Sequence, residues 1–345
     1  MGGKRFSEIT IALDADDRLR ANVLATHLLN VADTTTVRAG IARAITSSKI
    51  QSDVEITLSG FGHPGLLADA LSAYGLQKRL MVKIEAGTSV AAELDKYPIL
   101  DAAEITDLSA RQWIDDRQLG DELPMLTVDA AKVLAQSAIT VISTRLEVAD
   151  RPACKMFITD LDNTLWGGIV GEDGATNLQM GKNGSVDHGR YQHMLKKLTL
   201  QGILLVAVSR NRPEDVKQVF AINPDMGLNE NDFLTIDASW EPKAQTIARI
   251  LNSAQIAPDA AIFIDDDPLE QRQVASALPG LLVPTDGHQP DRALARLMAS
   301  GLFTGQKTTE DKARTHSTRA SMRLSQDLQS TNNRSKILKS LGIQL

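Results

Sequence analysis

The sequence predicts an α/β protein with two domains, a smaller α/β domain followed by a larger one built on a parallel sheet. Three observations lead to this prediction. The chain of 345 residues exceeds the roughly 100–200 residues of an ordinary domain. Short β-branched runs alternate with longer helical patterns, which is typical of parallel sheets. A segment with Pro152, residues 147–153, separates the two series and is the expected linker. We therefore expect domains at 1–150 and 151–345.

Composition excludes several classes of protein. The net charge of −6 argues against a nucleic-acid-binding protein, which normally carries a basic surplus. A single cysteine cannot form an internal disulfide, which suits a reducing cytoplasm. No apolar run approaches the roughly 20 residues that a membrane span needs. A cytoplasmic globular protein is expected.

In the first domain, four β-rich runs are expected to be strands and two segments have helical periodicity. The expected strands are Glu8–Ala12, Val54–Ser59, Leu80–Ile84 and Ile139–Ser143, and the expected helices are Leu66–Tyr74 and Ala130–Gln136.

In the second domain the alternation is clearer. The expected strands are residues 156–160, Ile203–Val208, Phe233–Ile236 and Ala261–Ile264, and the expected helices are Val186–Leu200, Pro213–Phe220, Lys243–Asn252 and Leu269–Ala277. Each strand is followed by polar residues, and ligands bind beyond the carboxyl ends of parallel strands. We therefore expect these polar clusters to converge. A polar helical stretch, Thr308–Asn333, is expected near the end of the chain.

The first of these clusters is Asp160-Leu-Asp-Asn-Thr-Leu-Trp, directly after a buried strand. One carboxylate, Asp160, can attack phosphorus, and Asp162 can handle the proton of the leaving group. Mg²⁺ would neutralise the two carboxylates and shield an incoming phosphate from the nucleophile.

The other clusters supply what phosphoryl transfer needs, which is mainly positioning and charge stabilisation. Ser209 follows the second strand and can donate a hydrogen bond to a phosphoryl oxygen. Lys243 opens a helix, where its ammonium can balance phosphate and aspartate. Asp265 and Asp266 end the fourth strand and can complete an oxygen-rich metal site.

This order of motifs resembles the haloacid dehalogenase superfamily. The longer string DLDNTLWGGIVGEDG resembles one branch, the FkbH-like glyceryl transferase/phosphatases, as do SRN at 209–211, FIDDDPLE at 263–270 and TEDKAR at 309–314. The resemblance runs from Lys155 to the C-terminus. It implies a Rossmann-like catalytic domain.

The resemblance also assigns roles. It implies that Asp160 is the nucleophile, that Asp162 is the general acid/base, and that Ser209 and Lys243 hold the phosphoryl group. Mg²⁺ would be bound by Asp160, the backbone carbonyl of Asp162, Asp265 and Asp266. The expected substrate-binding residues are Asn163, Thr164, Trp166, Arg210 and Asn211.

Members of this branch take the glyceryl group of 1,3-bisphosphoglycerate, remove phosphate and place glyceryl on the phosphopantetheine thiol of an acyl carrier protein. Such units feed polyketide-type or related secondary pathways. A runner-up function is a phosphatase of a small phosphorylated metabolite, and a third is a binding protein that keeps the fold as a scaffold. The intact acidic motif argues against the scaffold.

Two departures from the branch concern the substrate. The family usually has Lys after the second-motif serine, where this chain has Arg210. The family's Glu-Arg pair after the fourth strand becomes Glu270-Gln271-Arg272, so Arg272 is displaced by one step, or about 100°, along a helix.

The short intervals between these motifs leave no room for a large cap domain. An open site favours a bulky partner such as a carrier-protein arm. The Gly-rich segment Gly167–Gly184 is expected to form a flap hairpin. Residues 306–345 contain eight Lys/Arg and three Asp/Glu, so a basic helix there is a candidate docking site for an acidic carrier.

Several other residues have competing interpretations. Cys154 is expected to be a buried small hydrophobe at the opposite end of the sheet from Asp160, not a covalent carrier of glyceryl. Trp166 can either stack on a substrate or pack under the flap. His63, His188 and His193 lack metal-type spacing, and Ser59-Gly60 is more consistent with a turn than with a hydrolase nucleophile.

Overall fold

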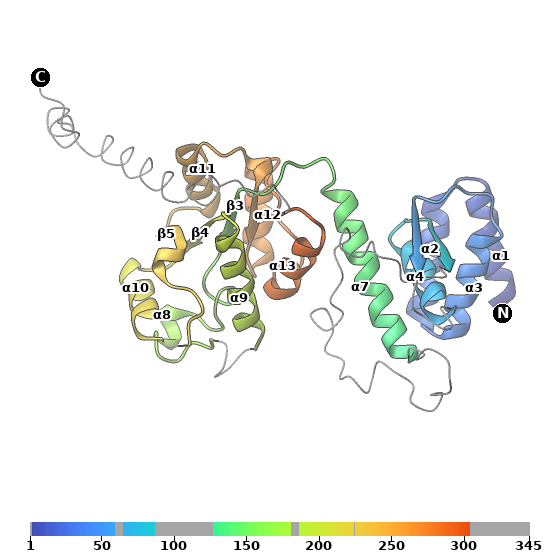
Figure 1. The fold of residues 1–345 in the computed structure, drawn as a ribbon, viewed down its shortest axis with the longest axis horizontal. Helices are drawn as coiled ribbons and strands as arrows, with labels where there is room; N and C mark the ends of the chain where they lie inside the picture. Colours follow the sequence, from blue (N-terminus) through green and yellow to red (C-terminus); the bar gives the residue numbers. More distant parts are fainter. Residues whose placement is uncertain (1, 59–64, 87–126, 181–185, 224, 304–345) are drawn as a thin grey trace, which may run out of the picture. The chain divides into compact units, whose positions relative to one another are not determined.

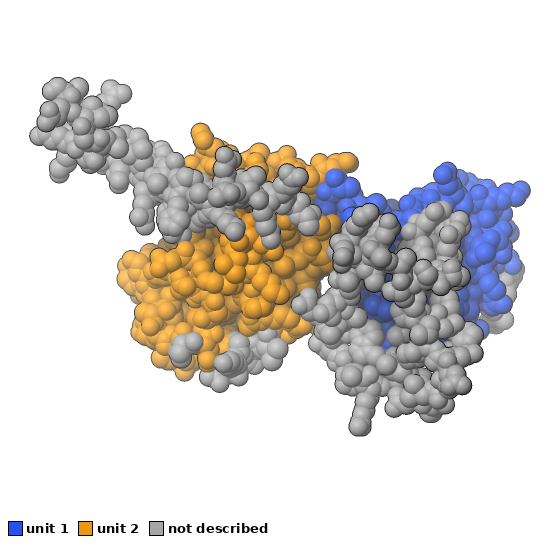
Figure 2. All heavy atoms as spheres, in the orientation of Figure 1, with its two compact units in different colours: residues 1–149 blue, residues 150–345 orange. Residues whose placement is uncertain are grey.

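The structure is a computed structural model that describes residues 2–58, 65–86, 127–180, 186–223 and 225–303. It divides into two compact units, residues 1–149 and 150–345 (Figure 2). The division falls one residue before the boundary expected from the sequence. No helix in these described ranges is long and apolar enough to cross a membrane.

Unit 1 combines helices with a small parallel sheet (Figure 1). Strand β1 pairs with β2 in parallel, with Val54 opposite Val82, and the connection between them contains α4. The described elements are α1 (Gly2–Asp14), α2 (Arg18–Val31), α3 (Thr35–Thr46), β1 (Val54–Leu58), α4 (Gly65–Gln77), β2 (Val82–Ala86) and α7 (Val128–Glu147).

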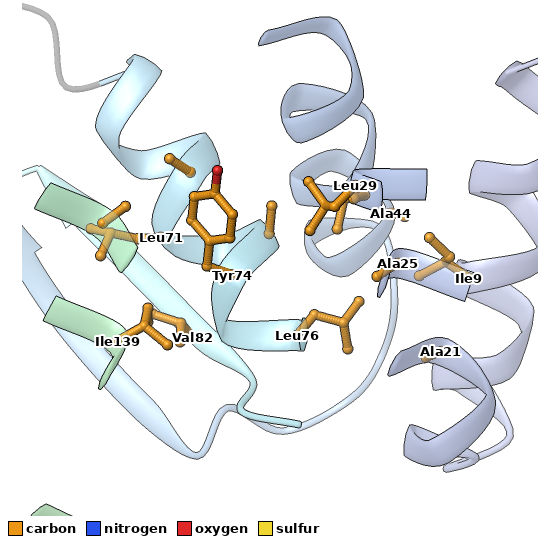
Figure 3. Close-up of a cluster of buried hydrophobic side chains, with 14 of the residues drawn as sticks. Ile9, Ala21, Ala25, Leu29, Ala44, Leu71, Tyr74, Leu76, Val82 and Ile139 are labelled. Carbon is orange, nitrogen blue, oxygen red and sulfur yellow. The ribbon is translucent and has the colours of Figure 1, made fainter. Parts of the chain in front are cut away.

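The core of unit 1 is made mainly by its helices. Ile9 of α1, Leu29 of α2, Leu71 and Tyr74 of α4 and Ile139 of α7 are all buried in one apolar cluster (Figure 3). Helices α2, α3 and α7 pack against α4, which is buried along most of its length.

Two of the strands expected in unit 1 are wrong. Residues 8–12 lie in α1 and residues 139–143 lie in α7. Both runs are rich in β-branched residues, but their buried side chains recur at helical intervals, as at Ile9 and Leu13 or at Ala135 and Ile139. A short apolar run does not distinguish the two periods. The strands expected near β1 and β2 and the helices expected within α4 and α7 are confirmed.

Asp33, between α2 and α3, ties three helices together. Its carboxylate accepts hydrogen bonds from Arg38 Nη1 at 2.7 Å and Tyr74 Oη at 2.7 Å, and Lys132 Nζ lies 2.8 Å away. Burial alone would raise the pKa of Asp33, but Lys132, Tyr74 and Arg38 outweigh it, so the pKa lies below its ordinary 3.8.

Replacing Asp33 with Asn is expected to destabilise unit 1 by about 3 kcal/mol, because Arg38 would remain buried without its counter-ion. The lowered pKa means that Asp33 stabilises the fold above about pH 4, and that this contribution is lost as pH falls through the lowered value. Urea titration followed by hydrogen exchange of peptides from residues 18–77 measures the change. The matched control is Asp16→Asn, since Asp16 is 83% exposed in a surface ion pair worth roughly 0–1 kcal/mol. Equal stability of the two variants would contradict this role.

Unit 2 is a four-stranded parallel sheet with the order β5-β4-β3-β6. This confirms the predicted α/β fold with a parallel sheet. The strands are β3 (Met156–Thr159), β4 (Leu204–Ser209), β5 (Phe233–Ala238) and β6 (Ala261–Ile264). The helices are α8 (Val170–Asp173), α9 (Val186–Leu200), α10 (Pro213–Ile222), η4 (Glu230–Asp232), α11 (Lys243–Ala254), η5 (Pro258–Ala260), α12 (Pro268–Ala277) and α13 (Pro290–Ala299).

The sheet is covered on both faces, which explains why its strands read as continuous apolar runs. Met156 and Ile158 pack in one cluster with residues of α11 and α12. Thr159, which points the other way, contacts Tyr191 of α9, and α9 packs against α13. Strand β3 has a neighbour on each side, so the residue after it lies at the centre of the carboxyl edge.

The elements predicted for unit 2 are confirmed, and β6 and α9 have the predicted bounds. Helix α13 was not predicted. The described part of the connection from β3 to β4 holds only α8 and α9, as expected without a large cap. In the Gly-rich segment, Gly167 pairs with Gln179 in an antiparallel bridge, and α8 lies between them, so this part is a helical loop instead of a hairpin. The helix expected at Thr308–Asn333 and the basic stretch 306–345 lie outside the described residues.

Candidate active site

The central carboxylate of the site is Asp160, which directly follows β3. Its backbone N–H donates to the carbonyl of Ile264 at 2.9 Å, which holds it beside the end of β6. The chain then turns sharply, and Asn163 adopts a left-handed conformation with φ of 53°. Its side-chain oxygen accepts the N–H of Gly168, so Asn163 closes the loop.

Lys243 contacts two carboxylates that follow different strands, Asp160 after β3 and Asp265 after β6. Its Nζ lies 2.9 Å from Asp160 Oδ1 and 2.6 Å from Asp265 Oδ2, and all three residues are buried. Lys243 is the first residue of α11 after Pro242, so a helix start at the end of β5 places it here. Three of the sequence-predicted residues therefore meet as expected from parallel strands.

Burial and charge perturb each of these groups. Burial, opposed by Lys243 and reinforced by Asp265, raises the pKa of Asp160 to about 7. Burial alone would lower the pKa of Lys243, but Asp160 and Asp265 together raise it. Burial and then Asp265 raise the pKa of Asp266. The cluster has more negative than positive groups, a pattern that favours binding of a further cation.

The residues around Asp265 fix its position from several sides. Asp265 Oδ1 accepts the N–H of Asp267 at 2.9 Å, and its carbonyl accepts Gln271 Nε2 at 2.6 Å. Any side chain at Gly287 would meet that carbonyl oxygen, so a glycine is required there. Thr164 Oγ1 accepts the N–H of Asp266 at 3.1 Å, which joins the loop after β3 to the loop after β6.

The carboxylates of Asp160, Asp265 and Asp266 can hold a metal ion, since one oxygen of each lies within 4.8 Å of the others. Asp160 Oδ1 is buried and has no hydrogen bond of ordinary geometry, although Lys243 Nζ is close. Oxygen-only ligands suit hard cations such as Mg²⁺ or Ca²⁺. Asp162 does not belong to this group through its side chain, and the predicted role of its backbone carbonyl stays a prediction.

Three hydrogen-bond donors hold the carboxylate of Asp162. Trp166 Nε1 and the N–H of Val170 donate to Oδ1 at 2.9 and 3.2 Å, and Asn211 Nδ2 donates to Oδ2 at 2.9 Å. Asn211 Nδ2 also lies 3.1 Å from Ser209 Oγ and links Asp162 to the end of β4. Asp162 is therefore oriented by the side chains of Trp166 and Asn211 and by one backbone N–H.

We expect Trp166→Phe to lower kcat for phosphate release about tenfold, because a hydrogen bond to a charged group is worth roughly 1.5–3 kcal/mol. The ring would still fill its place beside Phe220, where the two rings meet edge to face with centroids 6.1 Å apart. Steady-state phosphate release measures the effect. Trp240→Phe, at a side chain that is 72% exposed, is the control. An unchanged kcat in folded Trp166→Phe would show that the indole N–H does not position Asp162.

The predicted substrate-binding residues differ in exposure and in their contacts. Trp166 and Thr164 have no exposed surface, and the ring of Trp166 packs edge to face on Phe220. Their contact with a substrate stays a prediction. Asn163 closes its loop, and Asn211 bridges Asp162 and Ser209. Arg210 remains exposed at the edge of the site.

Arg210 has a partner that the sequence did not indicate. Its Nη2 lies 2.9 Å from Oε1 of Glu270, which is buried on α12. Gln271 is also buried and supports Asp265, whereas Arg272 is exposed and makes no such contact. The Glu270-Gln271-Arg272 sequence therefore places Gln271, and not an arginine, against Asp265 of the carboxylate cluster.

Two residues of α9 near the site were also missed. Tyr191 Oη lies 3.0 Å from Thr159 Oγ1, next to Asp160, and Gln192 Nε2 donates to the carbonyl of Leu165. His188 Nδ1 lies 3.2 Å from the carbonyl of Thr164, and His193 is exposed, so neither belongs to the carboxylate group. His63 and Ser59 lie outside the described residues. The apolar and polar alternation of α9 does not reveal which of its residues face the site.

Cys154 lies before the amino end of β3, as expected, and is buried. About six extended residues, or roughly 20 Å, separate it from Asp160. Burial raises the pKa of its thiol to about 12.

Cys154 should therefore react with iodoacetamide at pH 8 at least about tenfold more slowly than an exposed cysteine introduced by Ser47→Cys, because only a thiolate is reactive. Intact-mass analysis over time measures both rates. Modification of Cys154 at the rate of the exposed thiol would contradict its burial, and loss of activity in a folded Cys154→Ala variant would restore a covalent role for it.

Comparisons with known proteins add a structural likeness. No protein-family profile matches the chain, and no curated protein sequence is significantly similar to it. Among solved structures, the chain is similar to the crystal structure of the N-terminal part of the protein BF1531 from Bacteroides fragilis, which contains a phosphatase domain and is complexed with Mg. The identity is 21%, the likeness covers 76% of this chain and 97% of that chain, and the TM-score is 0.43.

Proposed function

We propose that the chain is a Mg²⁺-dependent phosphatase that works through an aspartyl-phosphate at Asp160. One observation carries this proposal: Lys243 lies between Asp160 and Asp265 at 2.9 and 2.6 Å, next to Asp266. A nucleophilic carboxylate, a fixed cation and a group of metal-binding oxygens are the parts that phosphoryl transfer needs.

Each side chain has a role in this proposal. A carboxylate oxygen of Asp160 attacks phosphorus, and the bond from phosphorus to the leaving oxygen breaks. Asp162 gives a proton to the leaving oxygen and then takes one from the water that hydrolyses the aspartyl-phosphate. Ser209 and Lys243 bind phosphoryl oxygens. Asp160, Asp265 and Asp266 would hold Mg²⁺, which supplies charge neutralisation.

The finer proposal concerns the substrate and rests on the motif resemblance. The thiol of a phosphopantetheinylated acyl carrier protein attacks the acyl carbon of 1,3-bisphosphoglycerate and displaces inorganic phosphate. The remaining phosphate monoester is then hydrolysed at Asp160, which leaves a glyceryl thioester on the carrier. Each of the two steps releases one phosphate.

Mass spectrometry of the carrier tests both levels. The full chain is incubated with Mg²⁺, 1,3-bisphosphoglycerate generated in situ and a phosphopantetheinylated carrier. A glyceryl adduct supports the transferase, and phosphate release without an adduct supports a phosphatase of small metabolites. If Asp160→Asn forms the same glyceryl adduct as the wild type, the proposed nucleophile is wrong. Absence of both products contradicts the phosphatase proposal.

A further inference from the structure

Unit 1 contains a cavity of about 440 Å³ between α3 and α4. The segment before β1 and the start of β2 complete its walls. Its volume falls within the roughly 300–1,000 Å³ of small-molecule pockets. It is separate from the carboxylate site, because every described lining residue belongs to unit 1.

The cavity contains a carboxylate without a partner among the described residues. Asp69 on α4 is partly buried and makes no hydrogen bond or ion pair with any residue in the described part of the chain. Burial raises its pKa, and the charges of Arg43 and Arg38 oppose that shift from a distance. Both guanidiniums are engaged elsewhere: Arg38 Nη1 binds Asp33, and Arg43 Nε donates to the carbonyl of Ala39. A carboxylate removed from water without a partner is costly to keep ionised.

The rest of the polar lining also offers acceptors. Ser72, one turn after Asp69 on the same face of α4, is buried and lines the cavity. The hydroxyl of Thr46 donates to the carbonyl of Ala42 at 2.9 Å, and that of Ser48 donates to Ile45 at 2.7 Å. The hydroxyl protons of Thr46 and Ser48 are therefore used, and these two oxygens can act towards a ligand only as acceptors. None of the described lining side chains is cationic.

Apart from Ser52, the described lining side chains that remain are apolar. Ile45, Ile50 and Met81 line the cavity beside the polar groups. A matching ligand therefore carries a positive charge and N–H donors at one end and a short alkyl chain at the other. An anionic ligand would meet Asp69 with no cationic side chain in the described lining to balance it.

We propose that this cavity binds a small primary amine in its ammonium form. The ammonium donates to Asp69 and to the hydroxyl oxygens, and the alkyl chain packs on Ile45, Ile50 and Met81. Charge-assisted hydrogen bonds to the carboxylate supply most of the selectivity. This site is independent of the phosphatase proposal.

The test uses n-butylammonium as the probe with the full chain. Its dissociation constant is measured by isothermal titration calorimetry or ligand-observed NMR at constant ionic strength. n-Butanol has a similar shape without charge, and tetramethylammonium has charge without N–H donors. We expect n-butylammonium to bind at least about tenfold more tightly than either, as hydrogen bonds to charged groups predict.

Variants assign the binding to this cavity. Asp69→Asn is nearly isosteric and removes a carboxylate that pairs with no described residue, so it is expected to fold and to weaken n-butylammonium binding at least about tenfold. Ser72→Ala is expected to weaken it less. Asp129→Asn, at an exposed carboxylate of α7, is the matched control and should not change it. Equal binding of the amine and the alcohol, undiminished binding by Asp69→Asn, or no measurable binding of the amine would each overturn the proposal.

Discussion

Replacing Asp160 with Asn is expected to abolish phosphate release, with kcat lowered by roughly 10⁴-fold or more, as for loss of a covalent nucleophile. The amide has the same size as the carboxylate but is a poor nucleophile. It also contributes less to a cation site that includes Asp265 and Asp266. The melting temperature should change less than for Lys243→Met, because Lys243 keeps its ion pair with Asp265 at 2.6 Å in this variant.

Two measurements check this expectation. Phosphate release is compared for the wild type, Asp160→Asn and Asp187→Asn, an exposed carboxylate of α9 that serves as the control. Rapid acid quenching followed by peptide mass spectrometry should find phosphate on residue 160 in the wild type. Asp162→Asn should increase that phosphorylated fraction, because hydrolysis of the aspartyl-phosphate loses its base. Phosphate on another residue would assign the nucleophile elsewhere.

The sheet of unit 2 was predictable because of where its strands lie. Strands covered on both faces by helices are almost wholly apolar, and the burial of β3, β4 and β6 is continuous. Polar residues follow them abruptly, so Asp160, Ser209 and Asp265 marked the carboxyl edge. Parallel strands then require these residues to lie close together.

The helices of unit 1 were less predictable. In α1, the run that contains Ile9 and Ile11 resembles a strand over five residues, although Ile11 is 62% exposed and Ile9 is buried. Only a longer window, in which Leu13 follows Ile9 by four positions, separates the helical period from the strand period. β-Branched composition alone is therefore insufficient over so short a stretch.

The contacts that support the candidate catalytic residues could not be predicted from the sequence, for a different reason. Thr164 contacts Asp266 across an interval of 102 residues, and Asn211 contacts Asp162 across 49. Local composition carries no information about such pairs. The motif spacing suggested which residues lie together at the sheet edge, but it did not reveal that Thr164 and Trp166 hydrogen-bond to Asp266 and Asp162.

The second large effect is expected for Lys243→Met. Methionine approximates the length of lysine without its charge, so Asp160 and Asp265 would remain buried side by side with no counter-ion. Loss of one preorganised charge at the reacting centre is expected to lower kcat by about 10²–10³-fold. Breaking a buried ion pair by removing one partner costs roughly 3–5 kcal/mol, so stability should also fall when metal is absent.

Mg²⁺ should then distinguish this explanation from simple misfolding. A cation bound by Asp160, Asp265 and Asp266 would replace part of the lost positive charge, and a ligand that binds only the folded state stabilises it. The rise in melting temperature from EDTA to excess Mg²⁺ should therefore be larger for Lys243→Met than for the wild type. Lys217→Met, at an exposed lysine of α10, is the control and should match the wild type in both conditions. If Lys243→Met retains full activity, or gains no more from Mg²⁺ than the wild type, Lys243 does not balance these carboxylates.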